Sequence, residues 1–302
     1  AELVRKLALA HNNVGLLEAE LGRGSESLAS LEAAERLQRT FADDVTASAS
    51  VAAELAATCG NQGIVLRQLD RRDEAAAKFR ATIAILEPLD ARSAADEKAL
   101  RTLAASYNNL ASLGESSDGE TAVDAYRRAI AIQRRLVHKQ SINRLYQGDL
   151  ARSYNNLGYL FARRREWQTA EARYRDAIRL QEILVQASPM AASYQRDLAI
   201  SYNNLGMVQS RGGELEAAET AFRRALELQA RLAAAAPTDA GVLSNLGGLY
   251  NNLGLLCERQ QQAEAAERNF RQAVRFQREA LAAAPGVVRY RELLANHYAN
   301  YE

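Results

Sequence analysis

An asparagine recurs at nearly constant spacing along this chain, and its side-chain amide could bind a peptide backbone. The copies are Asn13, Asn61, Asn109, Asn156, Asn204, Asn252 and Asn300. Asparagine is unfavourable inside helices because its amide competes for backbone hydrogen bonds, so the recurrence needs a cause. An amide has two donors and an acceptor, and a row of amides can hold an extended backbone without reading its side chains.

A structural role is the alternative, in which the amides bond to neighbouring helices and stiffen the chain. The preceding residue is also asparagine in several copies: Asn12, Asn108, Asn155, Asn203 and Asn251. Adjacent helical residues are rotated by about 100°, so the two amides cannot point the same way. We expect the first asparagine to join helices and the second to contact ligand.

We therefore predict a peptide-binding site formed by the second asparagine, strongest in the central copies. Tyr159 and Met207, two residues beyond a recurring leucine, are the expected side-chain contacts. The predicted site residues are Asn61, Asn109, Asn156, Asn204, Asn252, Tyr159 and Met207.

These asparagines belong to a repeated six-residue signature, whose clearest copy is Ser153-Tyr154-Asn155-Asn156-Leu157-Gly158. Its copies start at residues 10, 58, 106, 153, 201, 249 and 297, a nearly fixed period with a single one-residue slip. Such self-similarity predicts a repeat array in which each unit contacts only its neighbours.

Apolar spacing predicts two helices in each repeat, here called helix A and helix B. In the fifth copy, Leu198, Tyr202 and Leu205 share one face of helix A, and a second helical pattern runs from Leu215 to about Ala236. Pro237 then ends the unit. With only 4 prolines and abundant Ala, Leu, Arg, Glu and Gln, the sequence predicts an all-α fold.

The fourth copy carries a family resemblance in the residues Tyr154, Leu157, Gly158, Phe161, Ala170, Tyr174 and Ala177. They resemble the tetratricopeptide repeat (TPR), which implies a right-handed α-solenoid superhelix, here with six helix-A/helix-B repeats and a terminal helix. A standard TPR has about 34 residues, so the longer period here implies helices of about 20 residues. The long repeat most resembles the kinesin-light-chain-like class and arrays attached to bacterial signalling proteins.

We predict one solenoid domain over residues 1–302. The repeats are expected at about 1–42, 45–91, 93–140, 144–188, 191–236 and 238–284, with a terminal helix at 287–302. The absence of an initiator methionine, and the end just after the seventh signature begins, suggest a piece of a longer protein.

Two further polar columns are expected to be structural. A glutamine lies two helical turns after the helix-B aromatic position, on the face that packs against the next repeat: Gln38, Gln133, Gln181, Gln229 and Gln277. An arginine follows that position, and in three repeats a glutamate four residues earlier neutralises it: Arg175, Arg223 and Arg271 after Glu171, Glu219 and Glu267.

Composition gives no support for catalysis, cofactors, nucleic acid or membranes. The 38 basic and 37 acidic residues nearly cancel, and His11, His138 and His297 are too scattered to form a metal cluster or a triad. Cys59 and Cys257 are four repeats apart, too far for a disulfide in an elongated array. We expect a cytoplasmic protein.

The expected function is a scaffold that binds an extended peptide or partner segment through the asparagine row, with a monomer favoured. Two alternatives remain at this point. One is a structural self-assembly module that pairs through its end repeats or convex face. The other is a regulatory arm of a larger signalling enzyme, such as a bacterial serine/threonine kinase, that is not included in this chain.

Overall fold

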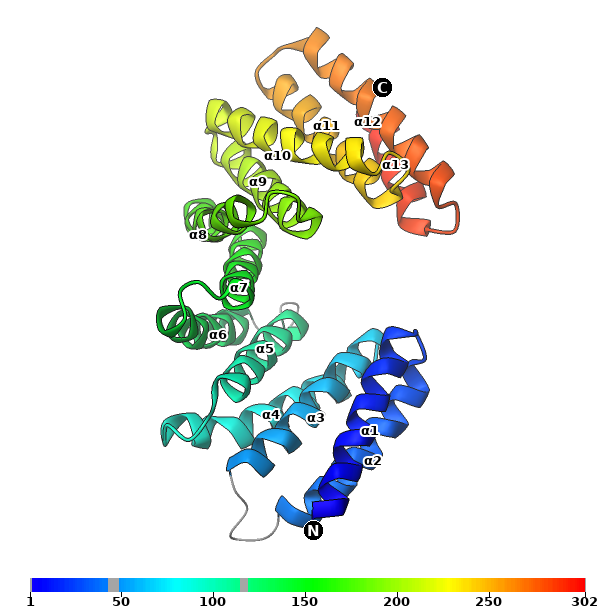
Figure 1. Ribbon diagram of the computed structural model, residues 1–302. Helices are drawn as coiled ribbons and strands as arrows, with labels where there is room; N and C mark the ends of the chain where they lie inside the picture. Colours follow the sequence, from blue (N-terminus) through cyan, green and yellow to red (C-terminus); the bar gives the residue numbers. More distant parts are fainter. Residues whose placement is uncertain (1, 43–48, 115–118, 302) are drawn as a thin grey trace. The chain divides into compact units, whose positions relative to one another are not determined.

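Helices account for all the regular structure in the ranges that the computed structural model describes, residues 2–42, 49–114 and 119–301 (Figure 1). The all-α class is therefore confirmed. The helices α1 to α12 have 18 to 21 residues, and the last, α13, has 14. Within the described ranges, no helix is both long enough and apolar enough to cross a bilayer.

Contacts divide the chain into two compact units, Ala1–Tyr146 and Gln147–Glu302. The first unit contains α1 (Glu2–Glu20), α2 (Gly24–Ala42), α3 (Ala49–Gln68), α4 (Arg72–Ala91), α5 (Glu97–Gly114) and α6 (Gly119–Lys139). The second contains most of α7 (Arg144–Arg163), then α8 (Trp167–Ala187), α9 (Ala192–Gly212), α10 (Leu215–Ala235), α11 (Ala240–Arg259), α12 (Ala263–Ala283) and α13 (Val288–Tyr301). The prediction of one domain with six repeats stays a prediction.

Within each unit, a helix packs against the next helix in the sequence. α1 packs on α2, α3 on α4 and α5 on α6, as do α9 on α10 and α11 on α12. The odd-numbered helices also contact one another, for example α3 with α5 and α9 with α11. These odd-numbered helices carry the signature and correspond to helix A, so signatures whose helices are in contact within one unit lie side by side.

The glycine of the signature lets helix B approach helix A. A Cβ atom on Gly206 would lie 2.7 Å from the ring of Phe222, and one on Gly254 would lie 2.4 Å from the ring of Phe270. The helix-B side chain at this position is buried in every repeat: Leu31, Phe79, Tyr126, Tyr174, Phe222 and Phe270. Glycine on one helix and a large side chain on the other therefore form one packing unit.

Five turns from helix A to helix B that the structure describes share one backbone conformation. Each has a residue with positive φ after helix A: Gly22, Asp70, Arg165, Gly213 and Gln261. At Arg165, φ is 62°; its N–H donates to Ala162 O, and the N–H of Glu166 donates to Phe161 O. This pair of bonds is the Schellman motif, which satisfies carbonyls left free at a helix end.

Proline marks several ends of helix B, as the sequence predicts. α8, α10 and α12 stop just before Pro189, Pro237 and Pro285, and the residue preceding each proline leaves the helical conformation, with ψ of 73° or 74°. Non-helical geometry is expected there because proline crowds a preceding helical residue. Pro88 differs from these, since it lies inside α4, close to the end of that helix.

The glutamine column packs against the following repeat, as expected. Gln229 donates to the backbone oxygen of Val242 at 3.2 Å, and Gln277 donates to that of Tyr290 at 3.1 Å. Both side chains are buried. Each bond joins helix B to the next helix A, so the amide fixes the step between repeats.

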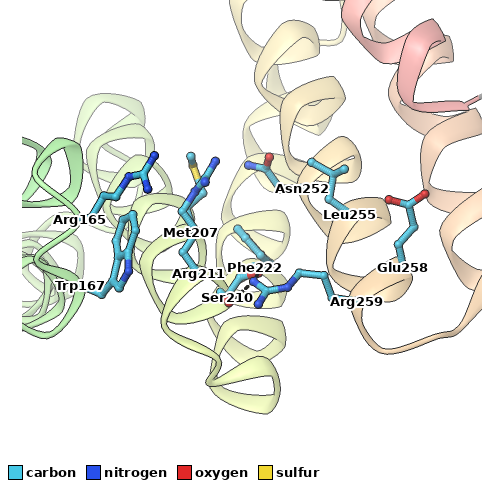
Figure 2. A pocket seen from close by; sticks show the side chains of 10 residues that line it. All are labelled: Arg165, Trp167, Met207, Ser210, Arg211, Phe222, Asn252, Leu255, Glu258 and Arg259. Carbon is cyan, nitrogen blue, oxygen red and sulfur yellow. Dashed lines mark hydrogen bonds between the residues drawn. The ribbon is translucent and has the colours of Figure 1, made fainter.

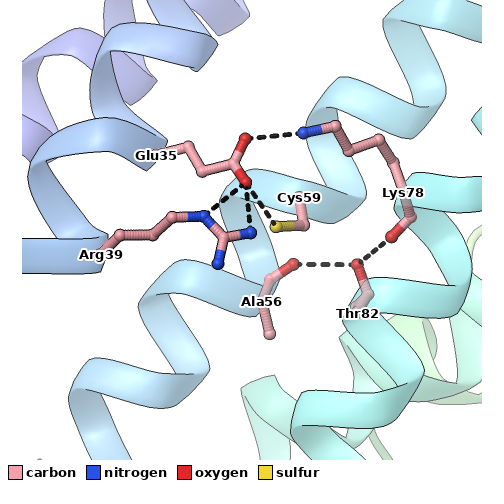
Figure 3. A network of polar contacts seen from close by, with 6 residues as sticks. All are labelled: Glu35, Arg39, Ala56, Cys59, Lys78 and Thr82. Carbon is pink, nitrogen blue, oxygen red and sulfur yellow. Dashed lines mark hydrogen bonds and ion pairs between the residues drawn. The ribbon is translucent and has the colours of Figure 1, made fainter. Parts of the chain in front are cut away.

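A buried ionic network ties α2, α3 and α4 together in the first unit (Figure 3). Glu35 accepts hydrogen bonds from Lys78 and Arg39, each at 2.7 Å, and lies beside the Cys59 thiol. Burial opposes ionisation of Glu35, but the bonds from Lys78 and Arg39 outweigh it and lower its pKa to about 2. Burial, followed by the nearby Glu35 charge, raises the pKa of Cys59 to about 11.

Candidate functional site

In four of the described signatures, the second asparagine bonds to the first asparagine of the preceding signature. Asn61 Nδ2 donates to Asn12 Oδ1 at 3.1 Å, and Asn252 Nδ2 donates to Asn203 Oδ1 at 2.8 Å. The same bond joins Asn204 to Asn155 at 3.4 Å and Asn300 to Asn251 at 2.8 Å. Adjacent A helices are thus linked by a row of amide–amide bonds.

The first asparagine has the interhelical role that the sequence predicts. Asn155 Oδ1 also accepts from the Ser201 hydroxyl at 3.1 Å, and Asn12 Oδ1 accepts from Thr58 at 3.3 Å. The second asparagine, however, takes part in the same bonds. Because an amide has two N–H groups and an acceptor, one such bond leaves part of its capacity for a ligand. Ligand binding by this residue stays a prediction.

Asn109 and Asn156 lie on the same face of their helices as the other members of the row. Asn109 Oδ1 accepts from Arg67 Nη1 at 3.0 Å, which also links α3 to α5. Asn156 lies on α7 and is half-buried. Each unit therefore contains members of the row, although their partners differ.

Tyr159 and Met207 are exposed, as a contact residue must be. Tyr159 is 50% exposed and Met207 is 38% exposed. Other repeats place exposed apolar side chains at the equivalent position: Leu16, Ile64 and Leu255. Tyr159 and Met207, which the sequence predicts as contacts, are the two central members of this column.

Met207 and Asn252 meet at a pocket of about 610 Å³ in the second unit (Figure 2). Trp167 from α8 and Leu255 from α11 add to its apolar wall. The full lining is Arg165, Trp167, Met207, Ser210, Arg211, Phe222, Asn252, Leu255, Glu258 and Arg259. Tyr159 and the other predicted asparagines are not part of this lining.

Three arginines and one glutamate set the charge of this pocket. Arg259 donates to the Ser210 hydroxyl at 3.1 Å and to the Ser210 backbone oxygen. Arg165 and Arg211 form no ion pair with any residue that the structure describes. By contrast, the helix-B arginines are neutralised, as predicted: Arg175 pairs with Glu171 and Arg223 with Glu219, both at 2.7 Å. The pocket can therefore accept a carboxylate.

Arg165, Arg211 and Arg259 are pocket residues that were not predicted from the sequence. Arg211 and Arg259 each follow the second asparagine by seven residues, or two helical turns, so the period contained a signal for them. Arg165 reaches the pocket from a turn, which helical spacing does not reveal. Trp167 is half-buried and also lines a second pocket of about 390 Å³.

Nothing among the described side chains suggests a metal centre. No group of three or more His, Cys, Asp or Glu residues lies close enough together to bind an ion in residues 2–42, 49–114 and 119–301. Cys59 and Cys257 are both buried and free. Burial lowers the pKa of His297, which packs in α13.

Comparison with protein families finds tetratricopeptide repeats in three stretches. Residues 150–189 match one model of this repeat, and residues 199–231 and 248–279 match another. No curated protein sequence matches the chain significantly. Tetratricopeptide repeats are generally protein-interaction modules without catalytic activity.

Solved structures with similar folds have low sequence identity. BtubC (BKLC) from P. vanneervenii has a TM-score of 0.62 and 19% identity, covering 86% of this chain and 91% of its own. The apo quorum sensor NprR from B. thuringiensis has a TM-score of 0.61 and 13% identity, covering 97% and 69%. The S. pombe nuclear import adaptor Nro1 has a TM-score of 0.58 and 10% identity, covering 98% and 99%. These likenesses support the solenoid fold.

Proposed function

Because this chain carries tetratricopeptide repeats, we propose that it is a scaffold that binds an extended segment of a partner protein along its A helices. The proposed contacts are the asparagines of the row and the exposed side chains beside them: Asn61, Asn109, Asn156, Asn204, Asn252, Tyr159 and Met207. The amides hold the peptide backbone with the donors and acceptors that remain after the interhelical bonds.

The observation that carries this proposal is the pocket where Met207 and Asn252 meet. Its wall of Trp167, Met207 and Leu255 suits one apolar side chain of a peptide. Asn252 stands at the same pocket and can bond to the adjacent backbone. Binding of an extended segment requires apolar groups for a side chain and amide groups for the backbone, and this pocket contains both.

The unpaired arginines extend the proposal to the charge of the ligand. Arg165 and Arg211 lie beside the apolar wall, and a guanidinium binds a carboxylate through two parallel hydrogen bonds. We therefore expect the bound segment to carry Asp or Glu next to its apolar residue. This charge preference supplies sequence selectivity that a row of amides lacks.

The location of the protein is also a proposal. Both cysteines are free and buried, as is common in reducing compartments. We propose that the protein acts in the cytoplasm.

A peptide-display selection against the chain tests the proposed function. We expect selected peptides to combine one large apolar residue with neighbouring Asp or Glu. Met207→Glu and Arg211→Glu should each weaken their binding at least tenfold, because each places a carboxylate in a pocket meant for an apolar or acidic group.

Arg268→Glu is the matched control, since Arg268 is an exposed arginine of α12 outside this pocket. It should leave binding unchanged. The proposal is rejected if the selection yields no peptides. It is also rejected if the selected peptides bind both pocket variants, Met207→Glu and Arg211→Glu, as tightly as they bind the native chain.

A further inference from the structure

A further pocket of about 400 Å³ lies between helices α9, α11 and α13 of the second unit. Its apolar wall includes Ile200, Leu249 and Leu293. Gly248 also lines it, and an added Cβ atom on this glycine would meet no atom within 4 Å. The space beside Gly248 is therefore open to a side chain of a ligand. We call this cavity the His297 pocket, after the histidine that lines it.

His297 is a buried side chain without a hydrogen-bond partner. It is only 3% exposed, and neither ring nitrogen bonds to any residue that the structure describes. At the equivalent position of two other signatures, the hydroxyls of Ser201 and Thr58 donate to the first asparagine of the preceding signature. Here that asparagine is Asn251, and it accepts from Asn300 instead. Position 297 therefore faces the preceding helix, α11, with its hydrogen-bonding capacity free.

The chemistry of this imidazole limits what the pocket can accept. Burial lowers the pKa of His297, so at neutral pH the ring is uncharged and has one N–H donor and one acceptor nitrogen. The acceptor needs a ligand group that carries a hydrogen, which a carboxylate lacks. Arg196 and Arg289 also line the pocket, so a cationic donor is repelled. A hydroxyl on a large apolar side chain meets these conditions.

We propose that the His297 pocket binds a tyrosine side chain whose hydroxyl donates a hydrogen bond to His297. The tyrosine ring packs against Ile200 and Leu293, and the guanidinium of Arg289 can stack on its face. This inference rests on the proposed function, because the tyrosine belongs to the same partner segment that fills the pocket at Met207.

The two pockets adjoin each other along α9 and α11. Ile200 of the His297 pocket and Met207 of the first pocket are seven residues apart, as are Gly248 and Leu255. Seven residues make two turns, so each pair shares a helix face and is separated by about 10 Å. An extended chain spans that distance with about three residues. Asn252 lines both pockets and can bond to the backbone between the two side chains.

NMR titration with N-acetyl-L-tyrosinamide and N-acetyl-L-phenylalaninamide tests the pocket with isolated residues. The native chain should bind the tyrosine probe about tenfold more tightly, because only this probe can donate to His297. His297→Phe removes the acceptor and should abolish the preference. Because this change also removes a buried unpaired polar group, thermal unfolding should show that the variant stays folded.

Gly248→Leu should fill the pocket and lower the affinity for the tyrosine probe at least about tenfold. Its side chain enters open space, so circular dichroism should show an unchanged helix content. Ala230→Leu is the matched control, since Ala230 is exposed on α10 and lies outside the pocket. A native chain that binds neither probe, or both equally, overturns the proposal. Tyrosine binding that survives Gly248→Leu overturns it as well.

Peptides from the display selection separate this proposal from the proposed function. They should carry tyrosine about three residues from their apolar residue, and Gly248→Leu should weaken their binding. Peptides that are weakened by Met207→Glu but not by Gly248→Leu would support the proposed function and overturn the assignment of the His297 pocket. A selection without peptides rejects the proposed function, whereas the two isolated probes still decide whether the pocket recognises tyrosine.

Discussion

The first asparagine of one signature and the second asparagine of the next form a hydrogen-bonded pair. The sequence assigned an interhelical role to the first and a ligand role to the second, because a helix points them in different directions. In the structure each points toward a different neighbouring helix, and the second donates to the first across that contact. Asn252 belongs both to this bond and to the pocket, so its two roles can be tested separately.

Alanine variants of one pair separate the two roles. Asn203→Ala and Asn252→Ala should each lower the free energy of unfolding by about 1 kcal/mol, because they remove the same hydrogen bond. The double variant should cost less than the sum of the two. Only Asn252→Ala should also lower the affinity of the chain for the selected peptides, which calorimetry measures.

Asn245→Ala is the control for this pair, since Asn245 is an exposed asparagine of α11 with no hydrogen bond to the described residues. If Asn252→Ala leaves peptide affinity at the native value, the row is purely structural.

Glu35 predicts a pH dependence of stability. Its pKa in the folded chain is about 2, below the ordinary value of 4.5, so the unfolded state binds the proton more tightly. The stabilisation is complete above pH 4.5 and is lost as the pH falls toward 2. After allowance for solvent screening, we expect a loss of about 2 kcal/mol. Urea unfolding at several pH values measures it.

Glu35→Gln should be less stable than the native chain at neutral pH, and the difference should shrink as the pH falls through this window. Glu264→Gln, at a highly exposed carboxylate, should show no such convergence. A constant difference between native chain and Glu35→Gln from neutral pH to pH 2 would contradict the assigned pKa.

Helix positions and lengths follow from local signals. Tyr202 and Leu205 mark helix A, Pro237 marks the end of helix B, and the period fixes the rest. The pocket was less predictable, because it combines residues of α8, α9, α10 and α11 that share no single helical face. Met207 and Asn252 were named from the period, whereas Arg165 depends on a turn conformation that the sequence does not display.

The contact between helices A and B makes the signature glycine sensitive to any side chain. Gly206→Ala would place a Cβ atom against Phe222, and we expect a loss of about 1–3 kcal/mol from overpacking. Gly248 also lies inside an A helix, α11, yet an added Cβ would meet no atom within 4 Å. Gly248→Ala should therefore stabilise the chain by about 0.5–1 kcal/mol.

Thermal unfolding of the two variants checks this pair. The informative result is the opposite sign of the two changes, since both replace glycine by alanine in a helix. Stabilisation by Gly206→Ala would mean that the A and B helices are not held as closely as the geometry indicates.

At the scale of the whole molecule, identical repeats do not have identical surroundings. Leu7 and Leu55 occupy equivalent positions in the period, so the sequence predicts the same burial for both. Their exposures of 49% and 4% differ because of the neighbouring helix, not because of the residue. The division into two units also has no counterpart in the nearly regular period.

The left-handed turn position gives a further expectation for the whole array. Glycine occupies it at Gly22 and Gly213, so Gln261→Gly and Arg165→Gly should both relieve backbone strain and raise stability by up to about 1 kcal/mol. Only Arg165→Gly should reduce the affinity for acidic peptides. Chemical denaturation and calorimetry on the two variants measure both effects, and equal binding by both would remove Arg165 from the site.

Equivalent positions in successive repeats of this chain can therefore be compared with one another. The repeats share the left-handed conformation at this turn position but carry different residues there. The backbone conformation alone therefore does not determine which residue occupies it. Arg165 keeps a conformation that glycine would adopt more easily, so under the proposed function this turn exchanges some backbone stability for a contact with the ligand.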